Sequence, residues 1–153
     1  MTCFWDSLRE SLKMTDINNT NFIYLLKKKN TKDIETLWNN KVLTDKQKEE
    51  NYTHIKDFDT NSIINGYDCS VCDPFLLLIS QIYETNIIHN YINTKIEYNN
   101  SKSKNILNFS SDTGHFWFVR ELSSYNYVNN NLYDLNNNIT PNISINNGPI
   151  WDP

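Results

Sequence analysis

The pattern of apolar residues changes once along the chain, and this change constrains the fold more than any other feature of the sequence. Up to residue 85 the apolar residues recur at helical spacing. After it they form short runs rich in β-branched and aromatic residues, separated by Asn, Ser and Gly. Helices followed by strands predict an α+β fold, in which N-terminal helices pack on a small, mainly antiparallel sheet.

The first predicted helix runs from Phe4 to Met14. Trp5, Leu8 and Leu12 fall on one face of this helix, and charged residues fall on the opposite face. The helix is therefore expected to lie on the surface of the domain, with its aromatic and aliphatic face turned toward the core.

Three further helical patterns follow, over residues 20–29, 32–38 and 44–57. The last of these is highly polar and predicts an exposed helix, for which Thr44 and Asp45 are candidate caps.

Next comes a turn-rich segment at residues 65–74, which reads NGYDCSVCDP and ends with Pro74 at a helix first position. The helix predicted after it, over 75–85, is apolar nearly all round and is expected to be buried.

Six short strands are predicted in the second half, over residues 86–92, 95–99, 105–109, 115–122, 125–128 and 131–135. The fourth contains HFWFV, whose lack of alternation predicts a central strand covered on both faces. The Asn-rich stretch 136–153 is expected to be a loosely attached tail, so residues 1–135 are predicted to form one domain.

Length and charge narrow the function classes. A chain of 153 residues suits one domain, and its net charge of −4 argues against a nucleic-acid binder that neutralises phosphates. No stretch is long and apolar enough to span a membrane, and no secretory signal is visible. With three cysteines and no signal, we expect reduced thiols and a cytoplasmic protein, in the host cytoplasm if the protein is viral. We also expect a monomer.

Two residues have the chemistry of a thiol protease. Cys3 opens the first predicted helix, where free amides and the helix dipole favour a negatively charged sulfur. His115 follows the turn SSDTG and begins a strongly apolar strand, a rigid position that suits a general base. A nucleophile and a base of this kind are the core of cysteine protease catalysis.

Three segments carry a resemblance to a known family: TCFWDSLRESL at 2–12, NYTHIKDFDTNSIINGYDCSVCDPFLLLISQIYETNIIHNYI at 51–92, and ILNFSSDTGHFWFV at 106–119. Together they resemble the OTU (ovarian tumour) family of papain-like cysteine proteases. The resemblance implies an OTU-type fold and a deubiquitinase that hydrolyses isopeptide bonds at the C-terminus of ubiquitin or a ubiquitin-like modifier. It further implies Cys3 as nucleophile, His115 as base, and no metal or organic cofactor.

The sequence departs from the family pattern in two places. Family members usually have an Asp-Gly-Asn-like stretch before the nucleophile, whereas only Met1 and Thr2 precede Cys3 here. Many members have an acidic or amide residue two positions after the histidine, and this sequence has Trp117.

The group that would orient the histidine must therefore come from elsewhere. The segment HFWFVREL…NLYDLN resembles Josephin deubiquitinases and papain-like enzymes, in which that group follows on the next strand. The resemblance leaves both Asp134 and Asn136 open, since alternation puts them on one face, and we favour Asp134.

Other readings remain open. Asp68-Cys69-Ser70 resembles the nucleophile motif of NlpC/P60 peptidases, which would make Cys69 the nucleophile. Cys69 and Cys72 form a CxxC pair without two further paired ligands, so we expect half-buried turn residues and no zinc site. His89 is expected at a sheet edge.

A non-enzymatic alternative is a catalytically weak or inactive OTU-like module that binds ubiquitin or another partner, including as one domain of a larger viral or cellular protein.

Overall fold

The computed structural model describes residues 2–120. The helices are α1 (Cys3–Ser11), α2 (Asn19–Lys28), α3 (Asp45–Lys56) and α4 (Pro74–Tyr83), with a 3-10 helix η1 (Thr60–Asn65). The strands are β1 (Leu37–Trp38), β2 (Asn86–Tyr91), β3 (Thr94–Asn99), β4 (Ile106–Ser111) and β5 (Phe116–Phe118). The predicted strands at 125–128 and 131–135 and the predicted tail at 136–153 lie outside the described residues.

The described strands form one sheet in the order β1-β3-β2-β4-β5. Three of its four strand pairings are antiparallel, and the pairing of β2 with β4 is parallel, so the sheet is mixed. The α+β class predicted from the sequence is therefore confirmed at this level.

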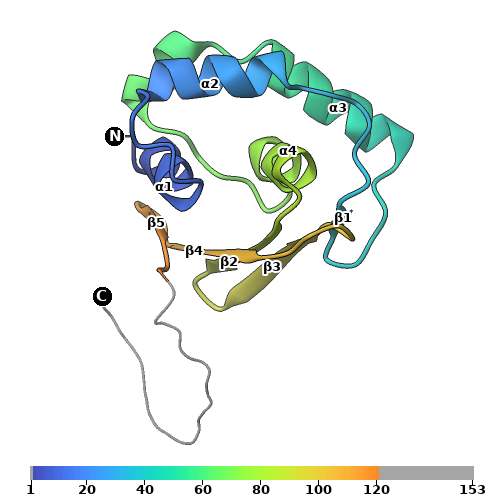
Figure 1. Cartoon of the computed structure of the whole chain (residues 1–153). Helices are drawn as coiled ribbons and strands as arrows, with labels where there is room; N and C mark the ends of the chain where they lie inside the picture. The colour runs from blue at the N-terminus through green and yellow to red at the C-terminus, as the bar shows by residue number, and fades with distance from the viewer. Residues whose placement is uncertain (1, 121–153) are drawn as a thin grey trace, which may run out of the picture. The chain divides into compact units, whose positions relative to one another are not determined.

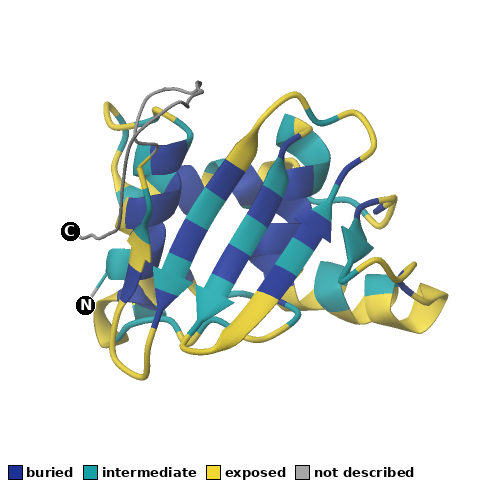
Figure 2. Ribbon diagram, turned by 90° about the horizontal axis from the view of Figure 1, so that it is seen from below, coloured by how far each residue is buried: buried dark blue, intermediate teal, exposed yellow. Residues whose placement is uncertain are grey.

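All the helices cover one face of the sheet. Figure 1 shows α1 and α4 against the sheet, with α2 and α3 forming an outer layer beyond them. In Figure 2, which views the sheet from below, buried and less buried residues alternate along the strands. The alternation follows from the strand period of two, which turns every second side chain toward the helices. Residues of this buried face include Ile87, Ile96, Tyr98, Leu107 and Phe109.

The helix α4 lies between the sheet and the outer helices, as its all-round apolar sequence predicts. Every residue from Pro74 to Ser80 is buried. The helix begins where the sequence indicates, because the Asp73 carboxylate accepts hydrogen bonds from the amides of Phe75 and Leu76 and Pro74 occupies the first turn.

The polar helix α3 also begins at its predicted cap. The Thr44 hydroxyl accepts from the Gln47 amide, and the Gln47 side chain accepts from the Thr44 amide, which together form a capping box. Ile55 is the buried residue of this helix, which explains its thin apolar pattern.

The prediction of a helix over residues 32–38 is wrong. Leu37 and Trp38 instead form β1, which pairs with β3 at the edge of the sheet. Asn39 and Asn40 follow with positive φ angles of 48° and 64°, and Trp38 pairs with Lys41 across them. Two consecutive residues with positive φ make a tight hairpin turn that asparagine tolerates well, so the chain reverses here and no helix forms.

The strand predicted over 115–122 is shorter than expected in the described part of the chain, where residues 115, 119 and 120 lie outside it. The strand β5 covers only three residues and is the last of the described strands in the sheet order. Phe116 is buried against the helices, whereas Trp117 is 38% exposed. In this run the aromatic residues thus lie on both faces of the strand that is last among those described. The helix η1 was not predicted.

Candidate active site

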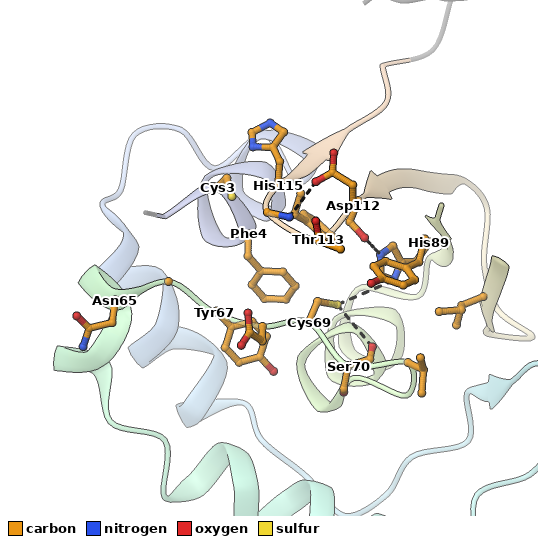
Figure 3. Close-up of a pocket in the computed structure, with 18 residues that line it drawn as sticks. Cys3, Phe4, Asn65, Tyr67, Cys69, Ser70, His89, Asp112, Thr113 and His115 are labelled. Carbon is orange, nitrogen blue, oxygen red and sulfur yellow. Dashed lines mark hydrogen bonds between the residues drawn. The ribbon is translucent and has the colours of Figure 1, made fainter. Parts of the chain in front are cut away.

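A pocket of about 500 Å³ opens beside the first residue of α1. Its walls come from the start of α1, the segment 65–71 that precedes α4, the end of β2, and the turn between β4 and β5 (Figure 3). Both residues that the sequence singles out for thiol protease chemistry, Cys3 and His115, line this pocket. They come from nearly opposite ends of the described chain.

Cys3 is the first residue of α1, and its side chain is half-buried. Thr2, at the N-cap position, makes no side-chain cap and instead donates a hydrogen bond to the Asp6 carboxylate, with an oxygen–oxygen distance of 2.8 Å. The amides of the first turn are thus left without a side-chain acceptor from Thr2. Free amides at a helix start are donors for a negatively charged group in the pocket.

Asp6 stabilises this start of α1. Its carboxylate accepts hydrogen bonds from Asn19 at 2.9 Å and from Arg9 at 3.2 Å, in addition to Thr2. Partial burial acts to raise the pKa of Asp6, but these hydrogen bonds prevail and lower it. An ionised carboxylate in the first turn also interacts favourably with the helix dipole.

The residues next to Cys3 and His115 tie α1 to β5. The rings of Phe4 and Phe116 pack edge to face, with centroids 4.9 Å apart, and both residues are buried. The Ser7 hydroxyl donates to the Phe116 carbonyl at 3.2 Å. Because each aromatic residue directly follows a pocket residue, this packing fixes the backbone positions of Cys3 and His115 relative to one another.

A tight turn between β4 and β5 presents His115. The Asp112 amide donates to the His115 carbonyl at 2.9 Å, and the Asp112 carboxylate accepts from the Gly114 amide at 3.0 Å. The imidazole of His115 stacks on the indole of Trp117, with ring centroids 5.3 Å apart and planes inclined by 22°.

Within residues 2–120 no hydrogen bond joins the Cys3 thiol to the His115 imidazole, and no side-chain oxygen accepts from that ring. Catalytic hydrogen bonds are often long in unliganded enzymes and shorten when substrate binds. Asp134 and Asn136, the predicted orienting residues, lie outside the described residues.

A second thiol and a second histidine meet deeper in the same pocket (Figure 3). The Cys69 sulfur lies 4.0 Å from His89 Nδ1, and His89 Nε2 lies 2.6 Å from the Ser111 hydroxyl oxygen. His89 is only 2% exposed and belongs to β2, the middle strand of the described sheet, so its prediction as a sheet-edge residue is wrong. The missed signal is its position two residues after Ile87, which puts both side chains on the buried face.

Burial determines the protonation of this inner group. It lowers the pKa of His89, so the imidazole is neutral at pH 7. Burial, and then the nearby Asp73 carboxylate, raise the pKa of Cys72 to about 11 and raise that of Cys69 further. Cys69 is therefore a protonated thiol, and it donates to the Ser70 carbonyl at 3.7 Å.

The Asp73 side chain holds two residues of the pocket wall in place. Its buried carboxylate accepts from the Tyr67 hydroxyl at 2.8 Å and from the Ser70 amide at 3.0 Å, while also capping α4. Burial raises the pKa of Asp73, and these hydrogen bonds oppose that shift. Asp73 thus fixes the path of the segment that includes Cys69.

Among residues 2–120 no three His, Cys, Asp or Glu side chains are grouped so that they could hold a metal ion. Cys69 and Cys72 are half-buried residues of the turn before α4, as predicted. No helix in this part of the chain is long and apolar enough to cross a membrane.

Comparison of the chain with protein-family models, with curated proteins and with solved structures finds no match in any of the three.

Proposed function

We propose that the chain is a cysteine isopeptidase of the OTU type. The observation that carries this proposal is that Cys3, at the start of a helix, and His115, directly before a strand, line one pocket although they are far apart in sequence. The packing of Phe4 on Phe116 supports it further, because it couples the two elements rigidly. Preorganisation of this kind is what nucleophilic catalysis requires.

In the proposed reaction the Cys3 thiol gives its proton to His115, and the sulfur attacks the carbonyl carbon of the isopeptide bond. The amides at the start of α1 stabilise the oxyanion, since the Thr2 side chain does not occupy them. His115 then donates the proton to the leaving lysine amine, which leaves a thioester on Cys3. Water, deprotonated by His115, hydrolyses the thioester and restores the free thiol.

The proposed substrate is ubiquitin or a ubiquitin-like modifier joined to a lysine through its C-terminus. This part rests on the sequence resemblance. The pocket beside Cys3 is consistent with this substrate. Its volume of about 500 Å³ suits a few residues of an extended chain, such as the C-terminus of a modifier.

Cys69 offers a second candidate nucleophile, because its sulfur lies 4.0 Å from His89 Nδ1. The electrostatics disfavour it: burial and Asp73 both raise the pKa of Cys69, so the thiolate is disfavoured where a nucleophile needs it. The Cys69–His89 pair fits better as a polar wall of the pocket.

One experiment separates Cys3 from Cys69 as the nucleophile, and an isopeptidase from a binding module. It uses a ubiquitin probe that has a thiol-reactive group at its C-terminus. Wild type, Cys3→Ala, His115→Ala and Cys69→Ala are incubated with the probe and compared by the mass shift on a gel. We expect an adduct in wild type and Cys69→Ala, a much slower one in His115→Ala, and none in Cys3→Ala.

Each other result has a definite meaning. Loss of the adduct in Cys69→Ala alone would move the nucleophile to Cys69 and refute the proposal. A folded wild-type protein that binds ubiquitin without forming an adduct would instead support the binding module.

A further inference from the structure

We propose that Trp117 is the positioning residue for the His115 imidazole, and that it acts through ring stacking in place of the usual carboxylate or amide. The inference rests on the proposed function, in which His115 is the base. Its observation is the stacked pair itself, with centroids 5.3 Å apart and an interplanar angle of 22°.

The strand geometry explains why these two side chains meet. Residues 115 and 117 are two apart along the strand direction, so they project to the same face, while Phe116 between them turns to the core and is buried. The register Ser110↔Trp117 and Ser111↔Phe116 holds this strand on β4. The indole is thus a fixed platform beside the head of the strand.

Within residues 2–120 no side chain forms a hydrogen bond with the His115 ring. Asp112 is the nearest acid in sequence, but its carboxylate accepts the Gly114 amide and so serves the turn. Stacking is therefore the contact that restrains rotation of the imidazole in this part of the chain.

Stacking on an indole differs chemically from a hydrogen bond to a carboxylate. A carboxylate occupies one ring nitrogen and stabilises chiefly the protonated imidazole. An indole contacts the flat face of the ring, so both nitrogens stay free at the ring edge and neutral and protonated imidazole are both held. One nitrogen can then serve Cys3 and the leaving amine while the other stays available to a further partner.

The position of Trp117 in the fold does not by itself require a tryptophan. It is 38% exposed, and it lies on the last of the described strands rather than in the core cluster. A valine or threonine would serve an exposed strand position as well. The stack on His115 thus gives the indole a role that the described core cluster does not account for.

The test uses the full chain and the variants Trp117→Phe, Trp117→Tyr and Trp117→Val, with His115→Ala as reference. Ile106→Ala is the matched control, because Ile106 is an exposed apolar strand residue outside the pocket. The first readout is the rate at which iodoacetamide alkylates Cys3, followed by mass spectrometry. The second is the NMR signal of the His115 ring protons, assigned by their loss in His115→Ala.

We expect Trp117→Val to slow the alkylation of Cys3 about 3- to 10-fold, the size expected for one lost aromatic contact, and Trp117→Phe and Trp117→Tyr to restore most of the rate. In Trp117→Val the His115 ring signals should also lose the upfield shift that the indole ring current produces. Ile106→Ala should leave both readouts unchanged.

Equal rates in wild type and Trp117→Val, with His115→Ala slow, would overturn the inference and leave the proposed dyad intact. An equally slow Trp117→Phe would overturn it too, because the ring would then not be the active feature. Asp134→Ala is run in the same assay, and a large loss of rate in it with none in Trp117→Val would overturn the inference and assign the role to Asp134. If His115→Ala alkylates as fast as wild type, the dyad itself fails, and with it the proposed function.

Discussion

Phe4 and Phe116 pack edge to face at 4.9 Å, and each is the immediate neighbour of a residue proposed to react. This contact joins a helix near the start of the chain to a strand near the end of the described part. The spacing between the proposed nucleophile and the proposed base is thus set by core packing, which resists deformation far more than an exposed loop does.

Phe116→Leu should therefore impair the reaction more than it impairs the fold. The substitution keeps a buried apolar side chain but removes three carbons and the ring contact with Phe4, so we expect it to lower the free energy of unfolding by about 1–2 kcal/mol. Misplacement of His115 should nevertheless slow the ubiquitin-probe reaction about tenfold or more. Urea unfolding and probe kinetics on the same sample check this. A rate that stays at the wild-type value would show that the contact does not position His115.

The three thiols should differ sharply in reactivity. With a pKa near 11, Cys72 is only about 0.1% thiolate at pH 8, and the pKa of Cys69 is raised further. We therefore expect iodoacetamide at pH 8 to label Cys3 first and to label Cys69 and Cys72 slowly until the protein is unfolded in urea. Peptide mass spectrometry over time measures this order; rapid labelling of Cys69 in the folded protein would contradict it.

Stability should fall as the pH drops below about 6.5 because of His89. Burial lowers its pKa in the folded state, so in mildly acidic solution the unfolded chain binds a proton that the folded protein does not. The stability that His89 contributes is complete above about pH 6.5 and is lost as the pH falls toward its folded pKa. Urea midpoints between pH 5 and 7.5 should show this slope in wild type and a shallower one in His89→Gln.

Asp6 has the same direction of pH dependence but acts at lower pH, and so offers an internal comparison. Its pKa is lowered in the folded state, so its contribution is present above about pH 4 and disappears only in stronger acid. A slope between pH 5 and 6.5 that persists unchanged in His89→Gln would exclude His89 as its source.

Asp73→Ala should be among the most destabilising single changes in the domain. It removes the cap of α4 and leaves the Tyr67 hydroxyl and the Ser70 amide without their acceptor. We expect a loss of about 3 kcal/mol, combining a lost cap with unsatisfied buried donors. Asp73→Asn, which keeps one acceptor oxygen, should cost about half as much. Thermal unfolding of both variants measures the difference, and equal midpoints would argue against a role of the cap.

Trp5→Phe should be tolerated better than its full burial implies. The indole is 0% exposed, but its N–H has no hydrogen-bond partner within the described residues. Removing that donor offsets part of the lost packing, so we expect a cost of about 1–2 kcal/mol, against about 3–5 kcal/mol for Trp5→Ala. Chemical unfolding of the two variants gives the comparison, and a Trp5→Phe cost near that of Trp5→Ala would indicate that shape alone matters.

Much of the architecture could be predicted from local chemistry. The cap at Thr44, the Asp73-Pro74 start of α4 and the buried run after it are encoded within a few residues of each other, so the sequence indicates them directly. The same is true of β2 and β3, which β-branched and aromatic residues mark clearly.

The errors arose where tertiary pairing decides the structure. Ile34, Leu37 and Trp38 have a helix-like spacing, but the turn at Asn39 and the partner strand β3 make the segment a strand. His89 was misplaced for a similar reason, because the position of β2 in the middle of the sheet depends on β4, which is distant in sequence.

The residues that line the pocket could be predicted only in part from residue type. Cys3 and His115 were identified from their local contexts, and both line the pocket. The Cys69–His89–Ser111 group and the stack of Trp117 on His115 were not, because each depends on the register between strands or on a loop path set by Asp73. Alternation within β5 could have indicated the stack, since it puts 115 and 117 on one face.

The parallel pairing of β2 with β4 has a consequence for how this protein could diversify. Parallel neighbours end at the same edge, and here Tyr91 stands opposite Ser111, with both residues on the pocket wall. The β2–β3 turn and the β4–β5 turn therefore leave the sheet side by side. Changing the length or the residues of either turn would alter the entrance of the pocket without changing the pairing of the strands. Variation in what the pocket binds should therefore concentrate in these two turns, and libraries for altered binding would best begin there.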